Sequence, residues 1–145
     1  MAAIAGQLAR STGIEIQSFN MTAVSITQGQ CVALDANGRV VLATASVGTV
    51  ARGIFVAVET VDNSAGSAGD KEIRCATGNT YVYCTAAGAI KVGETVKATA
   101  AGEVVAATGV FAAETHLGRY IGHENEEAEP TDAADNDIVI VRLGM

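Results

Sequence analysis

The chain has 145 residues, of which 49% are hydrophobic but only 4% are aromatic, and it contains no Trp. Its net charge is −7, yet residues 123–137 hold seven acids and no Lys or Arg, so the remainder is neutral. This balance argues against a nucleic-acid partner, because phosphate binding needs a basic patch. The distribution of apolar residues argues against a membrane protein, because no run approaches the roughly 20 apolar residues of a membrane span.

The composition predicts an all-β protein of one domain. The apolar mass is Ala and Val, and sixteen Gly against one Pro indicate many turns made by Gly. About ten short apolar runs, with no convincing helix, are typical of a compact β-barrel or small β-sandwich.

The first nineteen residues are the least regular part of the chain. Residues 2–10 have the composition of two helical turns, but an isolated helix that short is marginal in water. Ile14 to Gln17 alternates in polarity and predicts an edge strand. We expect an N-terminal arm at residues 1–19, extended or partly helical and ordered only against another surface, before a single β domain at 20–145. A frayed terminus is the alternative. We see no signal peptide here and expect synthesis in the host cytoplasm.

One stretch, Ile26 to Thr44, reads as strand, turn and strand. Val32 and Leu34 alternate with smaller residues, as in a half-buried strand. The pair Asn37-Gly38 predicts a type I′ turn, because both residues tolerate a positive φ. Val40 to Leu42 then predicts the return strand.

The same pattern occurs again at Ile90 to Thr108. Nine of the nineteen positions are identical, and they include the turn glycines and the paired valines after the turn. We interpret the two stretches as one hairpin built twice. A weaker similarity extends into the next strand, where Gly53 aligns with Gly118 after one inserted residue.

The other expected strands differ between the two copies. They are residues 53–59, 71–76, 79–84, a strand around Gly118, and 138–143, which is the strongest β run. Residues 61–70 are a polar loop of small residues, predicted not to pack. Residues 123–137 form an acidic loop before the last strand.

The three cysteines, Cys31, Cys75 and Cys84, are too few for a disulfide framework. We predict three reduced, buried thiols, since free Cys is among the most buried residue types. A bond between Cys75 and Cys84 across neighbouring strands is the alternative.

The sequence contains no recognisable catalytic or ligand-binding motif. His116 and His123 are the only histidines, and neither belongs to a nucleophile or zinc motif. The acidic loop lacks the spacing of a calcium loop, and residues 66–71 lack the phosphate-loop pattern. The hairpin tips carry no Lys, as a biotinyl or lipoyl carrier would require. We therefore predict no catalytic, cofactor-binding or metal site. The alternative is an enzyme or carrier subunit that uses Cys84, His116 and the acidic loop.

The run from Gly29 to Thr44, followed by Gly53 to Ala57, resembles the capsid cement (head decoration) proteins of tailed bacteriophages. These proteins show a G-x-x-V-x-L-D-A-x-G-x-V-x-x-A-T run, a short connection and G-[IV]-x-x-x. The match covers about 30 residues, and its motifs specify turns and core rather than a reaction. The acidic loop and the long arm are not features of that family.

The resemblance implies a β-rich structural protein, not an enzyme, that binds the outside of the phage capsid and bridges capsomers. Its partners would be the major capsid protein and further copies of itself, since such proteins are often trimers. We expect the arm to contact the capsid, and the candidate residues are Leu8, Arg10, Ile14, Ile16 and Phe19. A tail or fibre module of the virion is a further alternative.

Overall fold

The computed structural model describes residues 4–9, 14–35, 37–43, 54–78, 80–99, 102–107, 116–123 and 132–143. Within these residues the chain forms strands and no helix, which confirms the all-β prediction. The strands are β1 (Glu15–Asn20), β2 (Ser25–Ile26), β3 (Cys31–Leu34), β4 (Val40–Leu42), β5 (Ile54–Ala57), β6 (Val61–Asp62), β7 (Glu72–Thr77), β8 (Tyr81–Thr85), β9 (Thr95–Ala98), β10 (Val104–Ala106), β11 (His116–His123) and β12 (Ile138–Leu143).

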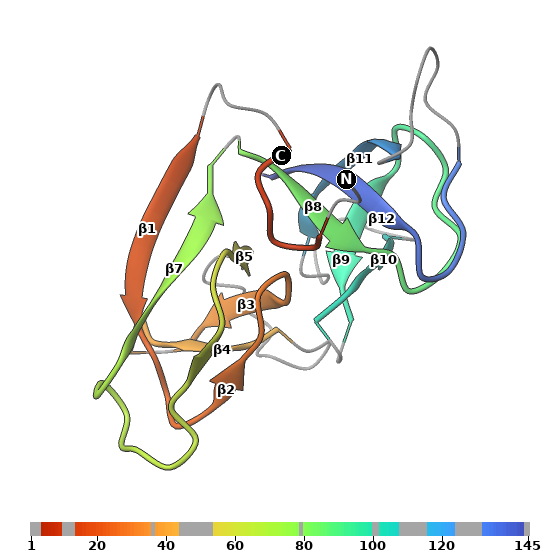
Figure 1. The fold of residues 1–145 in the computed structure, drawn as a ribbon. Coiled ribbons are helices and arrows are strands. Elements are labelled where there is room, and N and C mark those ends of the chain that lie inside the picture. Colours follow the sequence, from red (N-terminus) through yellow and green to blue (C-terminus); the bar gives the residue numbers. More distant parts are fainter. Residues whose placement is uncertain are drawn as a thin grey trace.

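The strands form two antiparallel sheets of five and a two-stranded ribbon. The first sheet has the order β1-β7-β5-β3-β4, and the second has the order β10-β9-β11-β12-β8. The ribbon pairs β2 with β6. Among the described residues none of these sheets closes on itself, so the barrel alternative is wrong. Figure 1 shows the two large sheets side by side, the first built from the N-terminal half and the second from the C-terminal half.

The two five-stranded sheets share one topology. When the strands of each half are taken in chain order, the counterparts are β1 and β8, β3 and β9, β4 and β10, β5 and β11, and β7 and β12. Each counterpart occupies the same place in its sheet, with antiparallel partners throughout. The duplication therefore covers whole sheets and not only the hairpin that the sequence repeats.

Backbone pairing in the first half has counterparts in the second, about 64 residues later. In the first hairpin Val32 pairs with Leu42, and 64 residues later Val96 pairs with Ala106. The Gly29 amide donates to the Ala57 carbonyl at 2.8 Å, and the Gly93 amide donates to the Tyr120 carbonyl at 3.0 Å. Parallel bridges also match, since Met21 lies opposite Val40 and Ala86 lies opposite Val104.

The pairing of the strand that follows each hairpin differs from the sequence alignment of Gly53 with Gly118. Val32 pairs with Phe55, and its counterpart Val96 pairs with Gly118 across an irregularity in β11. Gly118 thus holds the position of Phe55 in the duplicated sheet. The alignment of Gly53 with Gly118 is therefore wrong by two residues, because identical letters do not reveal the register of strand pairing.

The turn of the first hairpin is not of type I′. Gly38 has a positive φ of 74°, but Asn37 does not, so only one of the two residues is left-handed. The Asp35 side chain accepts hydrogen bonds from the amides of Asn37 (2.8 Å) and Arg39 (3.0 Å). The Gly38 amide donates to the Asp35 carbonyl at 3.1 Å. Such Asx bonding favours a wider turn that ends in a left-handed Gly.

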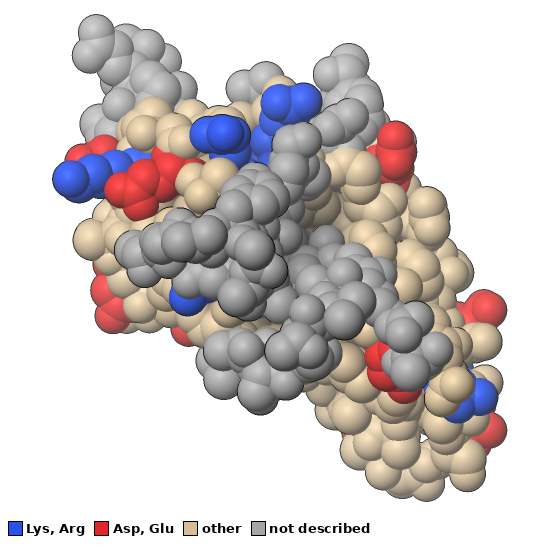
Figure 2. Space-filling model, turned by 180° about the vertical axis from the view of Figure 1, so that it is seen from behind, with Lys and Arg blue, Asp and Glu red and all other residues tan. Residues whose placement is uncertain are grey.

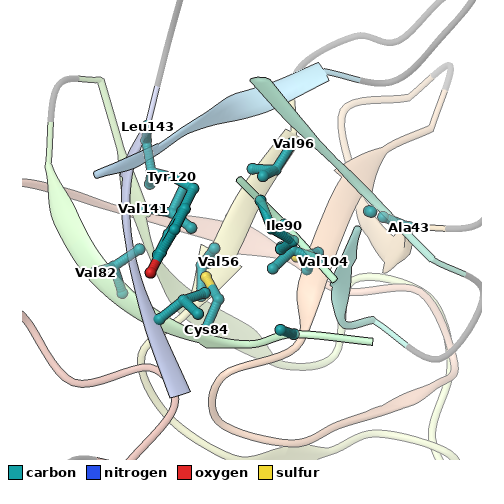
Figure 3. Close-up of a cluster of buried hydrophobic side chains, with 14 of the residues drawn as sticks. Ala43, Val56, Val82, Cys84, Ile90, Val96, Val104, Tyr120, Val141 and Leu143 are labelled. Atoms are coloured by element: carbon teal, nitrogen blue, oxygen red, sulfur yellow. The ribbon is translucent and has the colours of Figure 1, made fainter. Parts of the chain in front are cut away.

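The main core lies between the two large sheets and is made of small side chains, as the composition predicted. It contains Cys31, Ala33, Ala43, Val56, Ala76, Val82, Cys84, Ala86, Ile90, Val96, Ala98, Val104, Tyr120, Ala133, Val139, Val141 and Leu143. Tyr120 is the largest fully buried side chain, and Figure 3 shows it among Val82, Val141 and Cys84. A second cluster covers the other face of the first sheet and includes Met21, Ile26, Ile73 and Cys75.

The loop at residues 61–70 is more ordered than its composition suggested. It contains β6, and Asn63 is buried, with its side-chain amide donating to the carbonyls of Thr22 (3.0 Å) and Ser67 (3.1 Å). Residues 64–70 are exposed, as expected for a loop that does not pack, but Asn63 is an exception, because its buried amide satisfies backbone groups that the turn leaves unpaired.

Candidate functional site

The structure separates the five candidate residues of the arm into different environments. Leu8 is partly buried and packs against the main core, and Phe19 packs against the second cluster. Ile14 and Ile16 are exposed, with 41% and 40% of their surface accessible. Arg10 lies outside the described residues.

Of the two exposed candidates, Ile16 lies on strand β1 and Ile14 directly precedes it, and β1 forms one edge of the first sheet. The edge strand predicted at Ile14–Gln17 is confirmed, and it pairs along its whole length with β7, from Glu15 opposite Thr77 to Asn20 opposite Glu72. The arm boundary proposed between residues 19 and 20 falls inside this strand. In the described residues β1 has no second strand partner, so its other edge is open.

Geometry decides which backbone groups of β1 point to that open edge. The Met21 amide donates to the Lys71 carbonyl at 2.9 Å, and in an antiparallel ladder such bonded positions alternate along the strand. Ile16 and Ser18 therefore direct their amides and carbonyls away from β7. An open strand edge with two exposed isoleucines and no Lys or Pro is a surface that readily pairs with another chain.

The counterpart strand β8 has the same open side, but residues 6–9 cover it. The Gly6 amide donates to the Tyr83 carbonyl at 2.7 Å, and the Tyr83 amide donates to the Gln7 carbonyl at 2.9 Å. Leu8 lies opposite Val82 in an antiparallel bridge. No helix forms at residues 4–9, since the segment is a turn followed by this extended pairing. The two halves thus differ mainly in whether the edge strand is covered.

The exposed edge of β1 carries little charge. On β1 the only charged residue is Glu15, and nearby Arg74 forms an exposed ion pair with Glu59, with 3.4 Å between the guanidinium and carboxylate atoms. Seen from behind relative to Figure 1, Figure 2 shows acidic and basic groups at several separate places among a larger area of uncharged residues. The exposed edge of β1 therefore offers apolar side chains and backbone groups rather than a charged patch.

All three cysteines are free and buried, which confirms the prediction of reduced thiols. The alternative bond between Cys75 and Cys84 is wrong, because both thiols are free and they lie in different buried clusters, Cys84 in the main core and Cys75 in the second cluster. Burial raises the pKa of the Cys75 thiol to about 12, with a smaller contribution from the Glu59 carboxylate. The pKa of Cys84 is raised well above its usual value, first by a hydrogen bond with Cys31 and then by burial. Thiols held neutral in a core are poor nucleophiles.

The remaining residues of the enzyme alternative are not brought to Cys84 by any described contact. His116 and His123 lie on β11, but their side chains are outside the described part of the structure. Most of the acidic loop is also outside it. Asp137 accepts a hydrogen bond from the Ala134 amide at 2.8 Å, and Asp132 accepts one from the Val92 amide at 3.0 Å. Within the described residues no group of three acidic, His or Cys side chains is placed to hold a metal ion. They also include no helix long and apolar enough to cross a membrane.

The sequence predicted an edge strand at Ile14–Gln17, but not which of its two sides stays open. The alternation in Ile14–Gln17 gave the strand, but the pairing partners on its two sides are far away in the chain. One signal in the sequence is the pair of isoleucines together with the absence of Lys and Pro, because Lys and Pro commonly protect edge strands from pairing with another chain.

Comparisons with known proteins add information on the fold. No protein-family model matches the chain, and no curated protein sequence matches it. Among solved structures, the head fiber gp8.5 N base in bacteriophage phi29 is similar, with a TM-score of 0.57 and 16% sequence identity. The match covers 90% of this chain and 95% of the other. It shows that the two proteins share a fold.

Proposed function

We propose that this protein is a structural component of a phage virion that binds the outer surface of the capsid and stabilises it by bridging capsomers. It acts as a homo-oligomer, for which a trimer is the expected state, and its partner is the major capsid protein. The exposed apolar edge of β1, with Ile14 and Ile16, carries the contact.

The observation that carries the proposal is the shared fold with a phage head fiber base over 90% of the chain. It agrees with the hairpin pattern at Gly29–Thr44, which resembles capsid cement proteins. The site adds physical support, since the structure offers an open strand edge but, among the described residues, no cluster of catalytic groups. On a capsid, many copies of a modest interface sum to a large stabilisation.

The test is binding of the purified protein to bare capsids, followed by electron microscopy and by heating of the particles. We expect added density on the shell and greater heat resistance of the capsid. Capsids that bind no protein and lose their DNA at the same temperature would contradict the proposal. The mass of the free protein in solution tests the trimer separately.

Two variants with matched exposure locate the contact. Ile16 and Val92 are both 40% exposed, but Val92 precedes β9 in the second sheet, away from the β1 edge in the chain and in the sheets. We expect Ile16→Ser to weaken capsid binding and Val92→Ser to leave it unchanged, with similar stability of both variants. Equal losses of binding would show that the contact is not at β1.

A second candidate function is the base of a head fibre. The likeness to the phi29 head fiber base favours it, because the match covers 95% of that chain. In this case the protein would anchor a further, projecting element instead of bridging capsomers. Images of particles decide between the two: a fibre base gives density that extends outward from the shell, whereas a cement protein lies across the seams and raises heat resistance.

A further inference from the structure

Two of the three buried thiols meet where the two halves of the duplicated fold pack together. Cys31 is the first residue of β3 in the first sheet, and Cys84 lies on β8 in the second. Both are fully buried in the main core, and their thiols are in hydrogen-bonding contact. Cys75 is equally buried but belongs to the second cluster, on the other face of the first sheet.

A short segment of the second hairpin holds the two positions together. The Cys31 amide donates to the Gly102 carbonyl at 2.7 Å, and its thiol lies 4.0 Å from the Glu103 carbonyl oxygen. The next residue, Val104, bridges to Ala86, which is two residues beyond Cys84. Backbone pairing therefore holds β3, the second hairpin and the segment after β8 against one another around the two thiols.

We propose that Cys31 and Cys84 are a site for an intramolecular disulfide that ties the first sheet to the second. Cys75 cannot compete for this bond in the folded protein, because it faces the second cluster and not the main core. The bond would close a long loop that includes most of the first sheet, and such a link stabilises chiefly by restricting the unfolded chain. A reducing cytoplasm keeps the thiols free, whereas an extracellular medium permits the bond.

The reaction requires a small disulfide as the oxidant. One of the two thiols loses its proton, attacks a sulfur of the reagent and expels one reagent thiolate, which leaves a mixed disulfide. The second thiol then loses its proton, attacks the protein sulfur of that mixed disulfide and expels the other reagent thiolate. The protein loses two protons and two electrons, and the reagent disulfide is reduced to two thiols. Because both thiols are buried, the exchange takes place when the two sheets separate transiently or while the chain refolds.

The test is refolding of the full reduced chain in a redox buffer of hydroxyethyl disulfide and mercaptoethanol, followed by alkylation and mass mapping. Cys75 and Cys84 share a tryptic peptide, so chymotrypsin, which cuts at Tyr81 and Tyr83 between them, is the appropriate protease. We expect one linked pair of peptides, containing Cys31 and Cys84, and alkylated Cys75. Free thiols should fall from three to one. The oxidised monomer should also unfold at a higher denaturant concentration than the same protein after reduction.

The control is Cys75→Ala, which should form the same link, whereas Cys31→Ala and Cys84→Ala should form none within one chain. Links that involve Cys75, or a refolded protein that keeps three free thiols in a buffer that oxidises a simple dithiol, would overturn the proposal. Wild-type mapping needs no substitution, so the result stands even where a variant fails to fold.

Discussion

Phe19 and Phe55 stack on each other, with their ring centroids 5.0 Å apart and an angle of 11° between the ring planes. Phe19 lies on the edge strand β1 and Phe55 on the central strand β5, so the contact spans β7 between them. Both rings pack against the second cluster of buried residues. Phe19, one of the candidate capsid-contacting residues predicted from the sequence, thus packs β1 against the rest of the first sheet.

The stacked pair gives a direct measure of how firmly β1 is held. Phe19→Ala should lower the free energy of unfolding by about 2 kcal/mol, less than for a fully buried Phe because the ring is only half-buried. Phe55→Ala should destabilise similarly. The double variant should lose about 1 kcal/mol less than the sum, since the two rings share one contact. Urea denaturation of the four proteins checks this, and strictly additive losses would show that the stacking contributes nothing.

The duplication supplies a matched pair of glycines for testing the N-terminal segment. Gly29 and Gly93 are counterparts with nearly equal positive φ angles, 91° and 87°. An added Cβ at Gly29 would lie 2.5 Å from the Ala5 Cβ, whereas at Gly93 it would meet nothing within 4 Å. Gly93→Ala should cost about 1 kcal/mol from backbone strain alone. Gly29→Ala should cost about 2 kcal/mol more, because residues 4–9 must move.

Removal of residues 1–13 provides the control for this comparison. In the truncated chain the stability losses of the two Gly→Ala variants, measured against their own parent, should become equal. If Gly29→Ala still costs more than Gly93→Ala, the difference does not come from packing of the N-terminal segment. Should the truncated chain fail to fold, the comparison in the full chain still tests the contact.

The sequence predicted the repeated hairpin because its turn glycines and core valines are fixed by local geometry. Gly38 and Gly102 both adopt a positive φ, and Val40 and Val104 are both fully buried. It did not predict that β1 corresponds to β8, or β7 to β12. Strand pairing is made by backbone groups, so counterparts such as EIQSFN and YVYCT need no shared side chains.

For the candidate surface, the sequence predicted a strand at Ile14–Gln17 but not which residues face outward. Leu8 and Phe19 turn to buried clusters and Ile16 is exposed because of neighbours that come from distant parts of the chain. Period-two alternation gives two faces and cannot say which is covered. The contact of Cys31 with Cys84 was missed for the same reason, since it arises from packing of one sheet on another.

The bulged strand β11 contains a position where only Gly can be accommodated. A Cβ at Gly118 would clash with the backbone carbonyl of Arg142 on β12, and a backbone atom cannot move aside as a side chain can. Gly118→Ala should therefore lower the free energy of unfolding by about 3 kcal/mol and disturb the β11–β12 pairing. Gly88→Ala is the control, because its Cβ would meet only Val105 at 4.0 Å. Equal stabilities of the two variants, measured by thermal and urea unfolding, would refute this close approach.

The buried thiol of Cys75 should make the protein sensitive to alkaline pH. Its pKa rises from an ordinary value of 9.0 to about 12 in the folded state, mainly through burial. Between these two values the unfolded chain releases the proton more readily than the folded chain. Stability from this group is therefore complete below pH 9 and is lost as pH rises toward 12, by up to about 1.4 kcal/mol for each pH unit.

Comparison with Cys75→Ala isolates this effect from other groups that titrate at high pH. Below pH 9 the variant should be less stable than the wild type, because it loses buried contacts in the second cluster. Above pH 9 the gap should narrow and then reverse, since only the wild type carries the thiol whose ionisation favours unfolding. Urea denaturation across this pH range, with a reductant present to keep the thiols free, measures the gap directly. A gap that stays constant with pH would mean that Cys75 ionises equally well in the folded and unfolded chains.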